Sequence, residues 1–316
     1  MLSAYQSSNN SNELKETTDL QHACWVSLVD PTIEEMSTVS STLGVERSFL
    51  RAALDRDEGA RVEVEGAQTL IIFDVPTANK DKGEVYTFDT LPLAVILVEE
   101  TLITVTLDNN AALKSLLRKP PKDCCSEERS CFALQIILRS LSVYLEYLKK
   151  IDNRSRHLET QLYASLQNSE LIKMLGLQKS LVYFTTSLKS IETMLNKLAR
   201  TPLISKDTTH EELFEDVMIE SHQALEMANI YSNTLSGVMD AFASIISNNQ
   251  NLVMKTLTVV TVVISVPTLV FSFYGMNVNL PFDQINTDIL TWAIPVVISL
   301  LFTLITVVFL WRKKSL

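Results

Sequence analysis

The most suggestive spacing in this chain is a row of hydroxyl side chains inside a long apolar run near the C-terminus. After Asn251, hydroxyls recur at steps of three, four, three and four residues, at Thr258, Thr261, Ser265, Thr268 and Ser272. These steps place them along one face of a helix. Their oxygens could hydrogen-bond to the water shell of a cation, and Mg²⁺ gives up its water reluctantly. A row without carboxylates would let such a hydrated ion pass without holding it too firmly.

The same hydroxyls could instead bond back to carbonyls of their own helix, which is common in membrane helices. The regularity of the row favours a shared axis. One helix face cannot enclose a pore, because it has no opposite wall. Several copies around a cyclic symmetry axis can do so, and the chain is therefore predicted to be a homo-oligomer.

A short neutral stretch follows the row, in the segment "FYGMNVNLPF", and contains Gly275, Met276 and Asn277. Gly275 suits a helix end that needs a positive φ. A plain helix stop explains this glycine, but it does not explain the asparagine that follows Met276. The tripeptide is therefore a candidate functional feature.

Two apolar runs surround this stretch, at 256–274 and 289–311, and neither contains a charged residue. Each is long enough to cross a hydrocarbon core of about 30 Å as a helix. Trp292 and Trp311 stand at the ends of the second run, where interfacial indoles are expected. Two transmembrane helices are therefore predicted.

The positive charges near these runs predict their orientation. Lys255 precedes the first run, and the tail 312–316 begins with Arg312, whereas the loop 275–288 has no Lys or Arg. By the positive-inside rule, both termini lie in the cytoplasm and the loop lies outside. The chain is thus predicted to be a multi-pass protein of the plasma membrane, with the lipid bilayer as a partner.

The remainder of the chain shows no catalytic constellation. The net charge of the whole chain, −10, argues against nucleic acid as a partner and suits a protein that handles cations. No phosphate-binding glycine loop is present, so a nucleotide-driven pump is not supported. We expect no enzyme and no organic cofactor, because the four histidines are scattered without forming a ligand pair: His22, His157, His210 and His222. The cysteines fit no zinc module and are expected to be reduced thiols: Cys24, Cys124, Cys125 and Cys131.

Short segments rich in β-branched residues predict a small α/β domain over residues 21–125. The strand candidates are 24–29, 61–65, 69–75, 92–98 and 101–107. A helix is expected between the first two strands, capped by Asp30 and ended by Gly44. The polar residues 1–20 lack the basic and apolar regions of a signal peptide, and are expected to form a disordered tail.

Long helices should occupy residues 126–250, where apolar residues recur at steps of three and four. Thr208 with Glu211 offers a capping box for a new helix, and no convincing breaker follows until Pro267. A helix from near residue 209 into the membrane would be roughly 90 Å long. Such a helix is expected to be a stalk that leads to a pore.

Several of these features together resemble the CorA family of magnesium transporters, the two-span Gly-x-Asn group. The resemblance lies in "YGMN" before the second run, the ending "WRKKSL", and the order N-x-x-M-K-x-L-T from Asn251 to Thr258. It extends more loosely to "WVSLVDPTIEE". It implies a homopentameric, funnel-like channel with an α/β N-terminal cytoplasmic domain, long helices and two C-terminal transmembrane helices.

In that arrangement the pore-lining helix is 251–274, the external loop is 275–288 and the second transmembrane helix is 289–311. The resemblance implies that Gly275, Met276 and Asn277 of five subunits form a ring at the outer mouth, where Asn277 offers its amide oxygen. It implies these pore-lining residues: Asn251, Met254, Leu257, Thr258, Thr261, Ser265, Thr268 and Ser272. The loop departs from the family, since Pro281 is followed by Asp283 and Asp288 rather than by glutamate.

The function implied is the uptake of Mg²⁺ down its electrochemical gradient, with Co²⁺ and Ni²⁺ left open as substrates. Cytoplasmic Mg²⁺ would also regulate the channel, because in the family an acidic residue at the place of Asp216 faces one on the neighbouring subunit. Asp55 and Asp57 are the candidate partners here, and the choice between them stays open. The alternatives are a zinc transporter of the same family and a membrane-anchored sensor without a pore.

Overall fold

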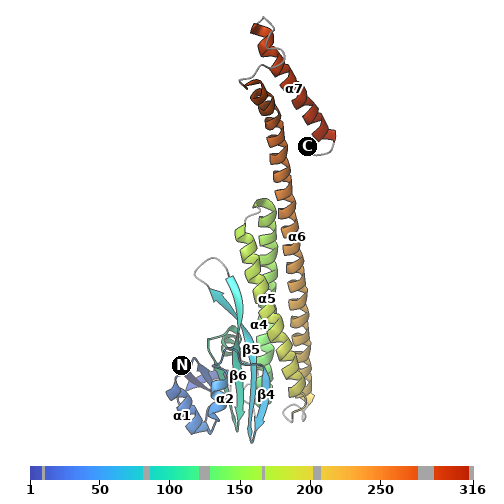
Figure 1. Cartoon of the computed structure of the whole chain (residues 1–316). Coiled ribbons are helices and arrows are strands. Elements are labelled where there is room, and N and C mark those ends of the chain that lie inside the picture. Colours follow the sequence, from blue (N-terminus) through green and yellow to red (C-terminus); the bar gives the residue numbers. More distant parts are fainter. Residues whose placement is uncertain are drawn as a thin grey trace. The chain divides into compact units, whose positions relative to one another are not determined.

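A computed structural model describes residues 1–8, 11–80, 86–120, 129–165, 168–201, 208–276 and 288–312. The chain divides into two compact units, Met1–Met239 and Asp240–Leu316. Figure 1 shows the chain and labels most of the helices. The α/β unit and the long helices expected from the sequence are both present.

A mixed sheet forms the base of the N-terminal unit. Over the described residues it has seven strands in the order β2-β1-β3-β7-β6-β5-β4, and only β3 and β7 pair in parallel. The strands are β1 (Leu2–Ser8), β2 (Ser11–Thr17), β3 (Trp25–Val29), β4 (Arg61–Glu65), β5 (Gln68–Lys80), β6 (Tyr86–Val98) and β7 (Thr101–Thr106). All five predicted strands are confirmed.

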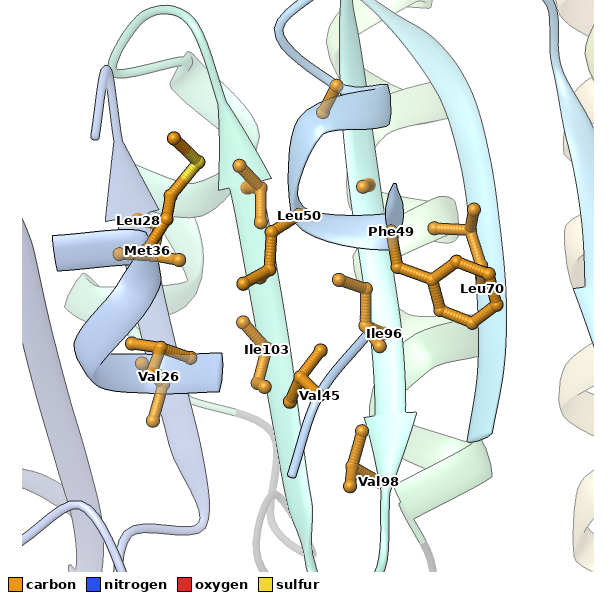
Figure 2. Packing of buried hydrophobic residues seen from close by; sticks show 14 of the residues in the cluster. Val26, Leu28, Met36, Val45, Phe49, Leu50, Leu70, Ile96, Val98 and Ile103 are labelled. Atoms are coloured by element: carbon orange, nitrogen blue, oxygen red, sulfur yellow. The ribbon is translucent and has the colours of Figure 1, made fainter. Parts of the chain in front are cut away.

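Helices α1 (Ile33–Leu43) and α2 (Arg47–Ala52) cover one face of the sheet. Figure 2 shows Phe49 and Leu50 of α2 directed at the apolar residues of β5, β6 and β7. Thr32, rather than Asp30, caps α1, because its side chain accepts a hydrogen bond from the amide of Glu35. Gly44 ends α1 in the left-handed region, with φ 66°, as expected.

Helices α3 (Ala111–Arg118), α4 (Arg129–Ser165) and α5 (Asn168–Leu198) lie on the other face of the sheet. Trp25 of β3 packs edge-on against Phe132 of α4 at 5.4 Å between ring centroids. Its indole nitrogen donates to the hydroxyl of Thr104 at 3.0 Å. Both sheet faces are thus buried, which explains near-continuous apolar runs such as the one at 91–98.

A polar contact joins the sheet to α5. Ser187 Oγ donates to Asp74 Oδ2 at 2.5 Å and lies 3.2 Å from Thr90 Oγ1. Tyr144 of α4 donates its hydroxyl hydrogen to the carbonyl of Asp74 at 3.2 Å. These hydrogen bonds satisfy polar groups that lie between the sheet and two helices.

The prediction of a disordered tail over residues 1–20 is wrong. β1 pairs antiparallel with both β2 and β3, and Ala4 is 4% exposed. Tyr5 packs against Trp25 at 5.1 Å between ring centroids. A segment this polar can still form strands, because hydrogen bonds between the backbones of neighbouring strands hold most of it on the sheet. The prediction of reduced thiols also fails for Cys24, which is disulfide-bonded.

Helix α6 runs without interruption over Thr208–Tyr274, and α7 covers Asp288–Arg312. The predicted start near residue 209 is therefore confirmed, and Gly237 does not stop the helix. Within the N-terminal unit, α6 buries Val217, Ala224, Ala228 and Leu235.

Candidate pore-lining face and its surroundings

The predicted hydroxyl row lies on the part of α6 that belongs to the C-terminal unit. The eight residues predicted to line the pore, five of which form this row, are all exposed: Asn251, Met254, Leu257, Thr258, Thr261, Ser265, Thr268 and Ser272. The buried residues of the same stretch are Val259 and Val270, at 9% and 6% exposure. At 3.6 residues per turn these two valines lie on the far side of the helix from the row. The row is therefore available to surroundings outside this chain.

Four hydroxyls of the row donate to the carbonyl four residues earlier. The donor–acceptor distances are 2.8 Å for Thr258 and Thr261, 2.7 Å for Ser265 and 2.9 Å for Thr268. The sequence had offered this back-bonding and a shared pore axis as competing interpretations. The two interpretations are compatible, because a hydroxyl that donates its hydrogen to a backbone carbonyl keeps its oxygen lone pairs as acceptors.

A groove of about 640 Å³ follows the C-terminal half of the row. Its lining combines the oxygens of Ser265, Thr268 and Ser272 with apolar side chains of Ile264, Leu269, Phe273 and Met276. No charged residue occurs in the described stretch 256–276. The row thus offers neutral acceptors in an apolar setting.

Gly275 follows α6 directly, and its amide donates to the carbonyl of Phe271 at 2.9 Å. The expectation of a positive φ here is wrong, since Gly275 lies outside the left-handed region. An added Cβ would lie 3.2 Å from the Phe271 carbonyl oxygen, which is a tight contact. Met276 is 53% exposed, and Asn277 lies outside the described residues.

The three predicted regulatory acids are all exposed in this chain. Asp55 and Asp57 share one turn after α2, where the amide of Asp57 donates to Asp55 Oδ1 at 3.1 Å. Asp216 lies on α6. Within the described part of the chain no three His, Cys, Asp or Glu side chains are grouped so as to hold a metal. A site between subunits would need a second copy, so that expectation stays a prediction.

Three described helices are long and apolar enough to cross a membrane: Arg129–Tyr163, Glu211–Tyr274 and Ala293–Arg312. The apolar window of the first is 61% buried inside the protein, against 6% and 11% for the other two. The first is therefore explained by the core of the N-terminal unit. The other two coincide with the apolar runs expected to span a membrane.

Sequence reasoning missed a cavity of about 860 Å³ between β5, β6, α4 and α5. A signal was present, since polar and basic residues that line it recur along α4 at steps of three and four.

Comparison with known proteins gives a consistent result. A family model described as CorA-like Mg²⁺ transporter protein matches residues 21–313. The cobalt/magnesium transport protein CorA of Methanocaldococcus jannaschii is 31% identical over 298 residues, covering 92% of this chain and 90% of its own length. The magnesium transport protein CorA of Helicobacter pylori is 23% identical over 260 residues, with 80% and 79% coverage.

The complete structure of the CorA magnesium transporter from Methanocaldococcus jannaschii has the same fold. Its TM-score is 0.81 at 24% identity, and the match covers 100% of this chain and 99% of that one. The resemblance drawn from the sequence is thus confirmed. The chain belongs to the family of CorA-like Mg²⁺ transporter proteins.

Proposed function

We propose that this protein is an uptake channel that carries hydrated Mg²⁺ into the cell through a pore lined by the hydroxyl row of α6. Five copies would surround the pore, with 251–274 and 289–311 crossing the plasma membrane. Both termini would lie in the cytoplasm and the loop 275–288 outside. The similar proteins from Methanocaldococcus jannaschii and Helicobacter pylori are named for cobalt/magnesium and magnesium transport, which supports this substrate class.

The observation that carries the proposal is the direction of the hydroxyl hydrogen bonds. Water bound to a cation points its hydrogens outward and therefore needs acceptors around it. Thr258, Thr261, Ser265 and Thr268 each commit their hydrogen to a backbone carbonyl. Their oxygens are left as acceptors, so the row suits a hydrated cation better than an anion.

No fixed charge is needed to drive the ion inward. A doubly charged ion gains about 4.6 kcal/mol per 100 mV of inside-negative potential, twice the single-charge value. A ring of Gly275, Met276 and Asn277 at the outer mouth of the pore would be the first part of the protein to contact the ion. The neutral row would then pass it without the tight binding that a carboxylate ring would cause.

Regulation by cytoplasmic Mg²⁺ forms part of the same proposal. Asp216 and one or both of Asp55 and Asp57 of a neighbouring subunit would repel one another when empty. A bridging Mg²⁺ would hold the subunits together in a closed ring. All three carboxylates are exposed in this chain, as a site between subunits requires.

The test compares two threonines of α6 that differ in the direction they face. Thr261 belongs to the row, whereas Thr256 lies on the opposite side of the helix. Both hydroxyls are exposed and both donate to the carbonyl four residues earlier, at 2.8 and 2.9 Å. Thr261→Val and Thr256→Val therefore remove the same local hydrogen bond from the same helix.

Ion entry is measured with a fluorescent indicator in liposomes holding the full-length protein, under an inside-negative potential. We expect Mg²⁺ entry to fall about fivefold or more in Thr261→Val, the equivalent of one hydrogen bond of about 1 kcal/mol. Thr256→Val should match the wild type. Equal effects of the two changes would contradict the proposed lining. Zn²⁺ entry that exceeds Mg²⁺ entry, with or without a proton gradient, would favour the zinc transporter.

A further inference from the structure

Helix α5 has one exposed face whose residues recur at steps of three and four. Residues at these steps lie on the same side of a helix. The α5 face consists of these seven residues, all of them exposed: Leu175, Lys179, Val182, Thr186, Lys189, Thr193 and Lys197. It contains three lysines and no acid, and Leu175 and Val182 are each more than half exposed. Apolar side chains gathered on an exposed face can mark an interaction surface.

Helix α6 carries the opposite charge on its own exposed face. The α6 face consists of Glu215, Ile219, Glu226 and Ile230, which recur at steps of four, seven and four and are all exposed. At 3.6 residues per turn these steps keep the four residues on one side of the helix. Ile219 and Ile230 are each more than half exposed, and no Lys or Arg occurs in the sequence 208–254. The α6 face is therefore acidic and apolar where the α5 face is basic and apolar.

The charges of the two faces are not paired within one chain. In the part of the chain that the structure describes, no salt bridge involves Lys189, Lys197, Glu215 or Glu226. Both faces are exposed in the single chain, so neither covers the other. A second copy of the chain could bring a face of the opposite charge to each of them.

The two faces also match in height along their helices. α5 and α6 run side by side in opposite directions (Figure 1), and His222 Nδ1 of α6 lies 3.6 Å from Glu192 Oε1 of α5. This contact fixes which residues lie at the same height, because each residue adds 1.5 Å along a helix. Counted from it, three pairs come level to within about 3 Å: Lys189 with Glu226, Lys197 with Glu215, and Val182 with Ile230. Each lysine is thus level with a glutamate, and valine with isoleucine.

We propose that the α5 face of each subunit packs against the α6 face of a neighbouring copy of this chain. The inference rests on the ring of subunits in the proposed function, and adds which surfaces of the N-terminal unit meet. Rotation about an axis along these helices leaves heights unchanged, so residues that are level in one chain stay level between neighbours. The contact joins two different faces, which is the type of interface that closes a ring.

The test is disulfide cross-linking of the full-length protein in detergent, with the native cysteines replaced by serine. The test variant, Lys189→Cys with Glu226→Cys, places one cysteine on each face at the same height. The matched control, Lys189→Cys with Glu215→Cys, uses the same two faces. Its cysteines lie about 15 Å apart along the helices, which is beyond the reach of a disulfide. Light scattering gives the number of subunits in each variant before oxidation.

After mild oxidation, denaturing electrophoresis without reductant should show a ladder of cross-linked multimers for the test variant. The control should lack this ladder. Assembled subunits that do not cross-link in the test variant, or that cross-link equally in both variants, would overturn the proposed contact and leave the proposed ring intact. A monomeric protein before oxidation would overturn the contact and the ring together.

Discussion

Asp74 is a half-buried carboxyl group at the contact between β5 and α5. Burial raises its pKa above the ordinary value, the hydrogen bond from Ser187 lowers it, and the neighbouring charge of Asp89 raises it further, with a net upward shift. Protonated Asp74 is therefore favoured more in the folded protein than in the unfolded chain. Its contribution to stability is fully present below the unfolded pKa, and is lost as the pH rises through the folded pKa.

The upward shift of the Asp74 pKa predicts how Asp74→Asn changes the pH dependence of unfolding. As the pH falls from about 7 to about 4, the wild type should gain stability relative to Asp74→Asn, because only the wild type can take up the proton. Urea unfolding of the full-length protein followed by tryptophan fluorescence measures the difference. Glu65→Gln on exposed β4 is the control. A difference between wild type and Asp74→Asn that stays constant over this range would contradict the assignment.

Single residues also mark what the sequence could predict of the site. The three-and-four spacing of Thr258 to Ser272 predicted a shared face, and these residues are exposed together with most of the same stretch of α6. The spacing could not predict where each hydroxyl hydrogen points, because this depends on side-chain rotation in the folded helix. At Gly275 the sequence suggested a left-handed backbone, which the structure does not show.

At the scale of elements, α2 is held on the sheet by large buried side chains. Phe49 is 2% exposed and packs in the cluster with Leu70 and Ile96. Phe49→Ala should lower the free energy of unfolding by about 3–5 kcal/mol, because it removes a buried ring and leaves a cavity. Chemical unfolding measures this loss. Ile33→Ala, at a site that is 74% exposed, should change the same quantity by less than about 0.5 kcal/mol; similar losses in both would contradict the described packing.

Most of the elements that the sequence predicted have a strong apolar pattern. The strands at 69–75 and 92–98 are apolar on both faces, and this pattern predicted them directly. The start of α6 was predicted from its capping box. β1 and β2 could not be predicted, because backbone pairing of β1 with β3, and of β2 with β1, places a largely polar segment on the sheet. The basic face of α4 was also missed, since apolar periodicity identifies the buried side of a helix and not what the other side lines.

At the scale of the assembled molecule, Mg²⁺ bound between subunits should make the N-terminal unit more rigid. Even a millimolar site corresponds to about −4.1 kcal/mol of standard binding free energy, and cyclic symmetry would repeat it at every interface. Limited proteolysis of the purified protein should therefore be slower with Mg²⁺ than without it. The triple change Asp55→Ala, Asp57→Ala and Asp216→Ala should abolish this protection.

The matched control for that experiment removes three other exposed acids, by Glu16→Ala, Glu34→Ala and Glu65→Ala. It should keep the protection by Mg²⁺. If the Asp55, Asp57 and Asp216 variant is protected as well as the wild type, these carboxylates do not form the regulatory site.

In the assembled protein, the hydroxyl row of α6 should face a water-filled pore. Single cysteines at Thr261, Ser265 and Thr268, and at Val260 and Val263, test it in membranes when the native cysteines are replaced by serine. The rate of modification by a charged, water-soluble thiol reagent is measured at each position. Modification should be fast at the three row positions and slow at Val260 and Val263. Equal rates at all five positions, or faster modification at the two valines, would contradict it.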